Sequence, residues 1–243
     1  MNKSPAEKLI EAKTRNKFRL LREFSAEYSF PFDDFQESGC RQLELGKSVL
    51  VAAPTGAGKT IVGEFATFLA LANGVRCFYT TPIKALSNQK YQEFTAKYGE
   101  SKVGLLTGDS SINGNAEILV MTTEVLRNMI YAKSSEIDEL GFVVLDEVHY
   151  LADRFRGAVW EEILIHLPER IQIVALSATV SNAEEFGDWL AKVRGDTEVV
   201  LSEIRPVPLY QHILIGNRLL DLLDRKSTRL NSSHVSESRM PSS

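Results

Sequence analysis

The segment that decides the fold is SVLVAAPTGAGKT, residues 48–60. Its start, Ser48–Ala52, is short and mostly apolar, as expected of a strand buried on both faces of a sheet. A helix-like run over Lys59–Ala72 follows directly. Between the two, Gly56 and Gly58 let the backbone bring N–H groups close to phosphate oxygens. The order of strand, glycine loop and helix therefore predicts a phosphate-binding P-loop.

Within this loop the residues have separate expected roles at a nucleoside triphosphate. The side chain of Lys59 is expected to reach the β and γ phosphates, and the Thr60 hydroxyl to ligate Mg²⁺. The strict P-loop pattern begins with glycine, whereas Ala53 occupies that place here. A glycine-rich turn before a helix, with a solvated lysine, is the alternative. The remaining residues expected to cradle phosphate are Thr55, Gly56, Ala57 and Gly58.

Outward from the loop, short apolar runs alternate with longer amphipathic ones. The predicted strands are Ser48–Ala52, Arg76–Thr80, Lys102–Leu106, Ile118–Met121, Phe142–Leu145, Ile171–Leu176 and Glu198–Leu201. The predicted helices are Lys59–Ala72, Ile83–Lys97, Glu124–Tyr131, Val159–His166 and Ala183–Leu190. Such alternation predicts an α/β domain with a mostly parallel sheet covered by helices on both faces.

A pair of carboxylates follows one of the predicted strands. The run Gly141–Leu145 ends directly in Asp146 and Glu147. Ligands of parallel sheets bind outside the carboxyl ends of the strands. Asp146 is therefore expected to hold Mg²⁺, and Glu147 to orient and deprotonate an attacking water. Two acids that only face solvent at a strand end are the alternative. His149 is either a structural histidine or a residue that couples the phosphate site to the rest of the protein.

Composition excludes several other classes of protein. With 243 residues, 44% hydrophobic and 25% charged, the chain resembles an ordinary globular protein. Two cysteines rule out a disulfide framework or a four-cysteine zinc site. The longest mostly apolar stretch, Phe65–Ala72, is too short to span a membrane. No secretory signal is visible, so we expect a cytoplasmic protein without a membrane partner. The net charge of −4 argues against a generally basic nucleic-acid binder but allows a local basic groove.

Both ends of the chain differ from the middle. Residues 1–29 are expected to form a charged helical extension, either a solvated helix or an arm that contacts nucleic acid. Residues 226–243 include seven serines and no apolar periodicity, and we expect them to be a non-native tail.

Several longer motifs resemble one known family. APTGAGKT, DEVH and Ser177-Ala178-Thr179 occur in the order of the DExH-box helicases of superfamily two. The segments TTPIKALSNQK (80–90), LLTGD (105–109), MTTE (121–124) and DEVHYLADRFRGAVWEE (146–162) are similar to the superkiller-type RNA helicases, especially the bacterial HelY-type members. The resemblance covers roughly residues 30–215. It implies a RecA-like lobe over 30–205, which we expect to be a single domain from about Phe30 to Leu201.

The resemblance also implies roles by position. Phe32 and Gln36 match an adenine-reading motif, and a glutamine amide can both donate to and accept from adenine. Ser177, Thr179 and His149 match residues that couple ATP state to strand separation. The residues that match contacts to the nucleic-acid backbone are Thr81, Pro82, Lys84, Ser87, Asn88, Gln89, Thr107, Gly108, Asp109, Thr122, Thr123 and Glu124. For many of these, ordinary turn and helix-cap roles are the alternative, and Gln36 is alternatively a surface amide.

Together these features predict the ATP-binding lobe of an ATP-dependent helicase that moves along or unwinds RNA or DNA, with ATP and Mg²⁺ bound. Residues 206–225 are expected to begin the connection to a second RecA-like lobe that this chain lacks. Because no arginine-finger motif follows, we expect slow hydrolysis by the chain alone. One alternative is a nucleotide-gated nucleic-acid-binding module without productive turnover. Another is a small-molecule P-loop kinase, which is disfavoured because nothing resembles an arginine-rich lid.

Overall fold

The computed structural model describes residues 17–148, 157–178, 183–207, 210–216 and 218–221. The chain divides into two units, residues 1–204 and 205–243. In the second unit, strands β9 (His212–Ile215) and β10 (Arg218–Asp221) form an antiparallel hairpin. The α/β domain lies entirely in the first unit. No helix in the described ranges is both long and apolar enough to cross a bilayer.

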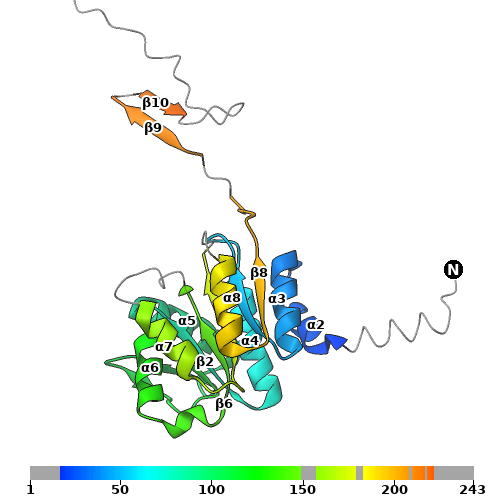
Figure 1. Cartoon of the computed structure of the whole chain (residues 1–243), viewed down its shortest axis with the longest axis vertical. Helices are drawn as coiled ribbons and strands as arrows, with labels where there is room; N and C mark the ends of the chain where they lie inside the picture. The colour runs from blue at the N-terminus through cyan, green and yellow to red at the C-terminus, as the bar shows by residue number, and fades with distance from the viewer. Residues whose placement is uncertain (1–16, 149–156, 179–182, 208–209, 217, 222–243) are drawn as a thin grey trace, which may run out of the picture. The chain divides into compact units, whose positions relative to one another are not determined.

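An eight-stranded sheet with the order β4-β3-β5-β2-β6-β7-β1-β8 forms the centre of the first unit (Figure 1). The strands are β1 (Ser48–Ala52), β2 (Arg76–Thr81), β3 (Val103–Leu106), β4 (Ser111–Ile112), β5 (Ile118–Thr122), β6 (Leu140–Leu145), β7 (Gln172–Ser177) and β8 (Thr197–Leu201). All neighbouring pairs are parallel except β3 and β4. The mostly parallel sheet predicted from the sequence is therefore confirmed.

Helices cover both faces of this sheet. One face carries α2 (Arg19–Ser25), α3 (Asp34–Glu44), α4 (Thr60–Asn73) and α5 (Lys84–Tyr98), and the other carries α6 (Thr123–Tyr131), the 3₁₀ helix η1 (Ser135–Ile137), α7 (Gly157–His166) and α8 (Ala183–Arg194). Alternate strand residues supply the two cores: Val49 and Val51 face α3 and α4, whereas Leu50 between them faces the other layer. This alternation is the period of two of a β-strand.

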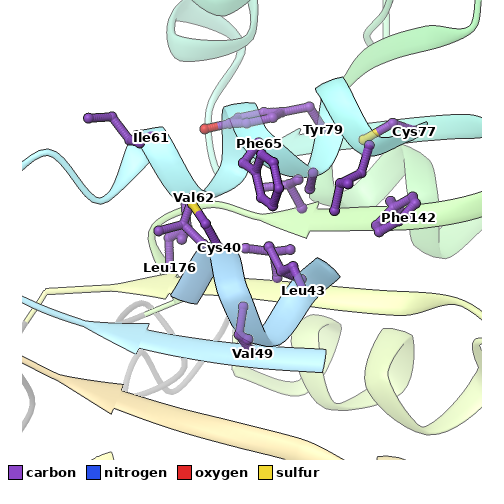
Figure 2. Close-up of a cluster of buried hydrophobic side chains, with 14 of the residues drawn as sticks. Cys40, Leu43, Val49, Ile61, Val62, Phe65, Cys77, Tyr79, Phe142 and Leu176 are labelled. Carbon is purple, nitrogen blue, oxygen red and sulfur yellow. The ribbon is translucent and has the colours of Figure 1, made fainter. Parts of the chain in front are cut away.

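Aromatic side chains fill the core on the α4 side. Figure 2 shows Phe65 of α4 and Tyr79 of β2 in the same cluster as Cys40 and Leu43 of α3. Phe24 of α2 is completely buried and packs against Phe65, with ring centroids 5.2 Å apart. Helix α2 therefore belongs to the core of the first unit, although the sequence suggests an extension over residues 1–29.

Strand order brings the predicted motifs to one edge. Strand β7 lies between β1, which leads into the P-loop, and β6, which leads into Asp146. Ser177, at the end of β7, is paired in register with Ala52 at the end of β1. The backbone N–H of Ala53 donates to the Ser177 carbonyl over 3.1 Å, which extends the ladder into the loop. The carboxyl edge therefore places the P-loop and Asp146 on the two sides of Ser177.

At the opposite, amino-terminal edge, three arginines donate to backbone carbonyls of the loops and of the helix and strand ends beside them. Arg170 binds the carbonyls of Ile137, Asp138 and Leu140 at 2.8–3.2 Å. Arg76 donates to the carbonyls of Ala116 and Gly114 and pairs with Glu136. Arg194 likewise binds the carbonyls of Leu164, Leu167, Pro168 and Ile171. Loops at this edge are thus held by charge-assisted hydrogen bonds, which are stronger than neutral ones.

Candidate nucleotide and nucleic-acid site

The P-loop has the backbone conformation that its glycines predict. Gly56 and Gly58 both have left-handed φ values, of 83° and 80°, which side chains with a Cβ rarely adopt. A Cβ on Gly58 would also lie 2.6 Å from Nε2 of Gln36. The exposed Thr55 and Gly56 form the outside of the loop, whereas Ala57 is buried. The loop therefore has the shape in which backbone N–H groups can face an anion.

Lys59 is folded back into this loop. Its Nζ donates to the carbonyls of Ala53 and Pro54, over 2.8 and 3.2 Å, and the residue is only 8% exposed. Burial lowers the pKa of Lys59, while the charges of Glu147 and Asp146 oppose that shift. The ammonium is thus bound to uncharged carbonyls beside two acids, and a phosphate would offer it a stronger, charged partner. Thr60 is half-buried at the first turn of α4.

The Asp146 carboxylate is held by two donors. The backbone N–H of Glu147 donates to Oδ1 over 2.9 Å, and the hydroxyl of Tyr79 donates to Oδ2 over 3.0 Å. Its own N–H donates to the carbonyl of Thr80 over 3.0 Å, which continues the pairing of β6 with β2. Burial raises the pKa of Asp146, and the neighbouring Glu147 raises it further. An acid with this environment gains from a nearby cation.

Glu147 has a φ of +57°, in the left-handed region that residues other than glycine rarely occupy. Such backbone strain costs on the order of 1–3 kcal/mol and tends to occur at functional sites. The turn places consecutive acids, Asp146 and Glu147, at the end of one strand. This strain has no signal in the sequence, because glutamate is not typical of that conformation.

Gln36 contacts the P-loop as well as its own helix. Its Nε2 donates to the carbonyls of Ala57 and Gly58, both over 3.2 Å, and its Oε1 accepts from the N–H of Asp33 over 2.8 Å. Gln36 is buried, and the half-buried Phe32 lies just before the helix. The alternative of a surface amide is wrong. In this structure both ends of the amide are bonded within the chain, so reading adenine remains a prediction.

Four of the residues predicted to contact nucleic acid are buried hydroxyls: Thr81, Ser87, Thr107 and Thr123. The Thr81 hydroxyl donates to the carbonyl of Ile83 over 3.0 Å and lies 2.7 Å from the Ser87 hydroxyl. The Thr123 hydroxyl donates to the carbonyl of Thr81 over 3.1 Å. Thr81, Ser87 and Thr123 therefore join the ends of β2 and β5 to the start of α5. Pro82 is also buried, and Thr122 and Glu124 are half-buried.

The exposed members of this group are Lys84, Gln89, Gly108 and Asp109. Lys84 forms an ion pair with Asp109, which also accepts a hydrogen bond from Thr107 over 3.1 Å. These bonds lower the pKa of Asp109, that from Lys84 most. The amide of Gln89 donates to Glu93 over 2.9 Å. Lys84 is thus the exposed cation of this group, already paired with an acid.

Two of the predicted coupling residues, His149 and Thr179, lie outside the described residues. Ser177 is buried, and its hydroxyl donates to the carbonyl of Ala178 over 2.9 Å. Sequence reasoning assigned no role to Tyr79, which directly precedes the TTPIKALSNQK motif and whose hydroxyl binds Asp146. It also assigned none to Lys90, the buried last residue of that motif.

The residues present fit a nucleotide with Mg²⁺. Within the described ranges there is no group of three or more His, Cys, Asp or Glu side chains that would hold a metal by themselves. Mg²⁺ is commonly bound by one or two protein ligands together with substrate phosphates and water. Asp146 has two oxygens with about four lone-pair sites, of which the two donors above occupy two. Thr60 and Asp146 therefore suit a metal that is shared with phosphate.

Comparison with known proteins identifies the family. The sequence pattern of the DEAD/DEAH box helicases matches residues 33–186. This chain belongs to that family. It is 63% identical over 207 residues to the probable helicase HelY of Mycobacterium leprae, covering 85% of this chain and 22% of HelY. It is 46% identical to the chloroplastic DExH-box ATP-dependent RNA helicase DExH15 of Arabidopsis thaliana, covering 87% of this chain and 20% of that protein.

The fold also matches solved helicase structures. A hypothetical ATP-dependent RNA helicase from Sulfolobus tokodaii superposes with a TM-score of 0.58 at 21% identity, covering 77% of this chain and 57% of that one. The resemblance to HelY-type DExH-box helicases and the RecA-like fold are thus confirmed. The chain spans about a fifth of the length of the two curated relatives.

Proposed function

We propose that this chain is the ATP-binding lobe of a helicase that couples ATP hydrolysis to movement along single-stranded RNA. The observation that carries the proposal is that the P-loop with Lys59 and the acids Asp146 and Glu147 follow strands on the two sides of β7, so that the charges of both acids act on Lys59. The buried Lys59 ammonium supplies positive charge for the phosphates, and the two carboxylates supply negative charge for Mg²⁺.

Each residue contributes a separate step. The N–H groups of the P-loop and the Lys59 ammonium bind the phosphates, which replace the loop's own carbonyls as partners of Lys59. Thr60 and Asp146 would hold Mg²⁺, which neutralises phosphate charge when it is bound. Glu147 orients the attacking water and accepts its proton. Phe32 and Gln36 would contact the adenine once Gln36 exchanges one of its internal hydrogen bonds.

On the nucleic-acid side, we assign the contacts to the exposed groups. Lys84, Gln89 and the backbone at Gly108 face solvent, and they would bind phosphates, which carry no sequence information. The buried hydroxyls of Thr81, Ser87 and Thr123 would hold these loops in place. RNA is favoured over DNA because the relative DExH15 is named an RNA helicase. Ser177, His149 and Thr179 would couple the two sides.

Efficient turnover requires a second RecA-like lobe in this proposal. Such a lobe would supply the arginine fingers, which are worth roughly 10³–10⁵ in rate in phosphoryl-transfer enzymes. The 243-residue chain should therefore bind Mg²⁺·ATP and hydrolyse it very slowly.

Equilibrium binding of a fluorescent, non-hydrolysable ATP analogue tests the proposal. The chain should bind the analogue with Mg²⁺ present, and Lys59→Ala should weaken binding. Lys102→Ala is a matched control, since Lys102 is an exposed lysine that directly precedes β3 at the amino-terminal edge. If the chain did not bind the analogue, or if both variants bound equally, the nucleotide site would be wrong.

A further inference from the structure

We propose that Tyr79 is a positioning residue of the Mg²⁺ site. Its buried hydroxyl holds the Asp146 carboxylate in one orientation, and α5 fixes the tyrosine ring through Lys90 and Phe94. The inference rests on the proposed function, because it assumes that Asp146 binds Mg²⁺ together with a nucleotide. Tyr79 itself would touch neither the metal nor the nucleotide.

Sheet register places these two side chains within reach of each other. Tyr79 on β2 lies opposite Val144 on β6, and both belong to the core cluster on the α4 side. Asp146 follows Val144 by two residues, so it is the diagonal neighbour of Tyr79 on the same face. With strands about 4.8 Å apart and a rise of about 3.3 Å per residue, such positions lie roughly 8 Å apart, a distance that a long aromatic side chain spans. The observed hydrogen bond of 3.0 Å from the Tyr79 hydroxyl to Oδ2 agrees with this arrangement.

The Tyr79 hydroxyl is a polar group among mostly apolar side chains on this face of the sheet. On this face, the other central strand positions are apolar: Val49, Val51, Cys77, Val144, Val174 and Leu176. Tyr79 is completely buried, and a buried hydroxyl costs free energy unless it forms a hydrogen bond. Phenylalanine would fill the same space without that cost. The hydroxyl is therefore explained by its one specific partner, the carboxylate of Asp146.

Two helices hold the ring in place. Nζ of Lys90 lies 5.6 Å from the centre of the Tyr79 ring, and the Phe94 ring packs edge-on with centroids 5.3 Å apart. From α4, Gly63 approaches so closely that a Cβ there would lie 3.2 Å from Cε2 of Tyr79. The ring thus has contacts from α4 and α5 and little freedom to turn.

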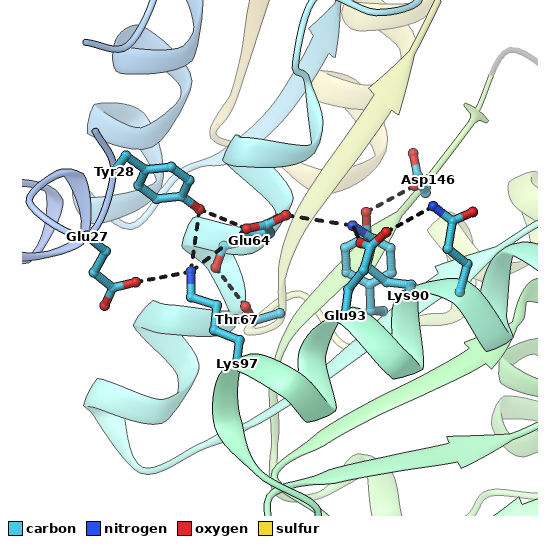
Figure 3. A network of polar contacts seen from close by, with 10 residues as sticks. Glu27, Tyr28, Glu64, Thr67, Lys90, Glu93, Lys97 and Asp146 are labelled. Atoms are coloured by element: carbon cyan, nitrogen blue, oxygen red, sulfur yellow. Dashed lines mark hydrogen bonds and ion pairs between the residues drawn. The ribbon is translucent and has the colours of Figure 1, made fainter. Parts of the chain in front are cut away.

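Lys90 connects this ring to the P-loop helix. Its Nζ pairs with Glu93 at 2.6 Å and with Glu64 of α4 at 3.7 Å. Glu64 is one helical turn after Thr60, the expected Mg²⁺ ligand at the start of α4. Figure 3 shows Lys90 between Glu64 and the Asp146 end of this network, with Tyr28 and Lys97 at the other end. The helix that begins with Lys84 therefore also supports the tyrosine behind Asp146.

The fixed orientation matters for metal binding. The Glu147 N–H and the Tyr79 hydroxyl each take one lone pair on opposite oxygens of Asp146. Without the hydroxyl, the carboxylate loses one of its two anchors and can rotate away from a metal. Groups that orient a metal ligand typically change metal affinity or activity about 10–100-fold when they are removed. Loss of the Tyr79 hydroxyl should therefore act on the Mg²⁺ dependence and leave metal-free nucleotide contacts unchanged.

The experiment is a Mg²⁺ titration of nucleotide binding to the 243-residue chain. Affinity for a fluorescent, non-hydrolysable ATP analogue is measured from zero to saturating Mg²⁺ for the natural protein and for Tyr79→Phe. The Mg²⁺ concentration that gives half of the effect should rise about tenfold in Tyr79→Phe. Its affinity for the analogue without Mg²⁺ should stay within about twofold of that of the natural protein.

Tyr98→Phe is the matched control, because Tyr98 also packs against Phe94, with centroids 6.0 Å apart, and lies at the end of α5. Its Mg²⁺ dependence should equal that of the natural protein. Lys90→Met, which keeps the length of the side chain over the ring, should shift the Mg²⁺ requirement in the same direction as Tyr79→Phe but by less. Thermal denaturation without Mg²⁺ shows whether each variant is folded.

The outcomes separate this inference from the function on which it rests. If Asp146→Asn raised the Mg²⁺ requirement and Tyr79→Phe did not, the positioning role would be overturned while the nucleotide site stood. A larger shift in Tyr98→Phe than in Tyr79→Phe, or in Lys90→Met than in Tyr79→Phe, would also overturn it. A natural protein that binds no analogue at any Mg²⁺ concentration would overturn the proposed function, and this inference with it.

Discussion

The two halves of the carboxyl edge both consist of segments that follow parallel strands, and they differ in the charge of the polar groups that these segments hold. At the half proposed to bind nucleotide, the buried Lys59 ammonium donates to loop carbonyls, and the half-buried Asp146 carboxylate accepts from an N–H and a hydroxyl. At the half predicted to bind a strand, the buried groups are the neutral hydroxyls of Thr81, Ser87 and Thr123. Its exposed charge, Lys84, is paired with Asp109.

This difference separates residues that would bind a ligand from residues that hold the loops in place. Groups with perturbed pKa values occur more often at functional sites, and Lys59 and Asp146 are two such groups. Buried hydroxyls with internal partners, in contrast, mainly fix loop geometry. Substitutions in the nucleotide half should therefore change ligand binding and chemistry. Substitutions of the hydroxyls should first change stability.

The largest effect is expected from Glu147→Gln. In a protein in which this chain is joined to a second RecA-like lobe, hydrolysis should fall about 10²–10⁴-fold, the usual contribution of a general base. Binding of the non-hydrolysable ATP analogue should remain, because the amide keeps the size of the side chain. Steady-state ATP turnover and equilibrium binding measure the two effects. Hydrolysis at the natural rate would show that another group accepts the proton.

Lys59→Ala should have the next largest effect, a loss of analogue binding of about tenfold or more, since hydrogen bonds to charged groups contribute roughly 1.5–3 kcal/mol. Fluorescence titration measures it, with Lys102→Ala as the matched control. An unchanged affinity in Lys59→Ala would mean that the lysine stays on its own loop carbonyls when nucleotide binds.

In the other half, Thr123→Val should lower the free energy of unfolding by about 1–3 kcal/mol, because the Thr81 carbonyl loses a buried donor. Analogue binding should be unaffected. The control is Thr122→Val, at the neighbouring half-buried threonine. Urea unfolding measures the free energy of unfolding of both variants, and that of Thr122→Val should be less changed. Equal stabilities, combined with lost RNA binding in Thr123→Val, would show that Thr123 contacts RNA and does not mainly support the loop.

Asp146→Asn should stabilise the ligand-free chain slightly. Because burial raises the pKa of Asp146, its ionised form is disfavoured in the folded state. The destabilisation is absent below the pKa of the unfolded chain and develops as the pH rises through the raised folded pKa. The variant should therefore melt about 2–4 °C higher at neutral pH if roughly 1 kcal/mol is regained. At acidic pH the two melting temperatures should converge, and a difference that grew there would contradict this assignment.

The smallest effect is expected from Lys84→Ala. Binding of single-stranded RNA should be weak and should fall with salt, with a slope of about −0.7 in log affinity against log salt for each neutralised phosphate. Lys84→Ala should reduce the slope by at most about that amount, since Asp109 already pairs with Lys84. Titrations of labelled RNA and DNA strands at several salt concentrations provide the measurement. Salt-independent binding, or binding unchanged by Lys84→Ala combined with Gln89→Ala, would remove this surface from the proposal.

Much of the fold is predictable because its signals are local. The predicted strands at Ser48–Ala52 and Ile118–Met121 lie within one residue of the observed ones, and the glycine loop has the expected shape. Strand β4 escaped prediction because it has two residues and is defined by pairing with β3. Helix α3 was also missed, although Asp33 and Gln36 form a capping box at its start.

Within the site, residue types were easier to predict than their surroundings. The acids and the P-loop lysine follow from spacing along the chain, whereas the contact of Tyr79 with Asp146 depends on the register of β2 with β6. Burial of the Ser87 hydroxyl depends on how α5 rests on the sheet, which periodicity along a single segment does not specify. Long-range register therefore decides which members of a motif face a ligand.

The arginines of the amino-terminal edge have a consequence for how the chain can move. Each guanidinium presents donors in a rigid planar fork. Arg170 directs two of its nitrogens at carbonyls between the end of η1 and the first residue of β6. The loop cannot shift without breaking several of these bonds at once. Conformational change should therefore be confined to the carboxyl edge, and backbone amides of the arginine-bound loops should exchange with deuterium at rates that bound nucleotide does not alter.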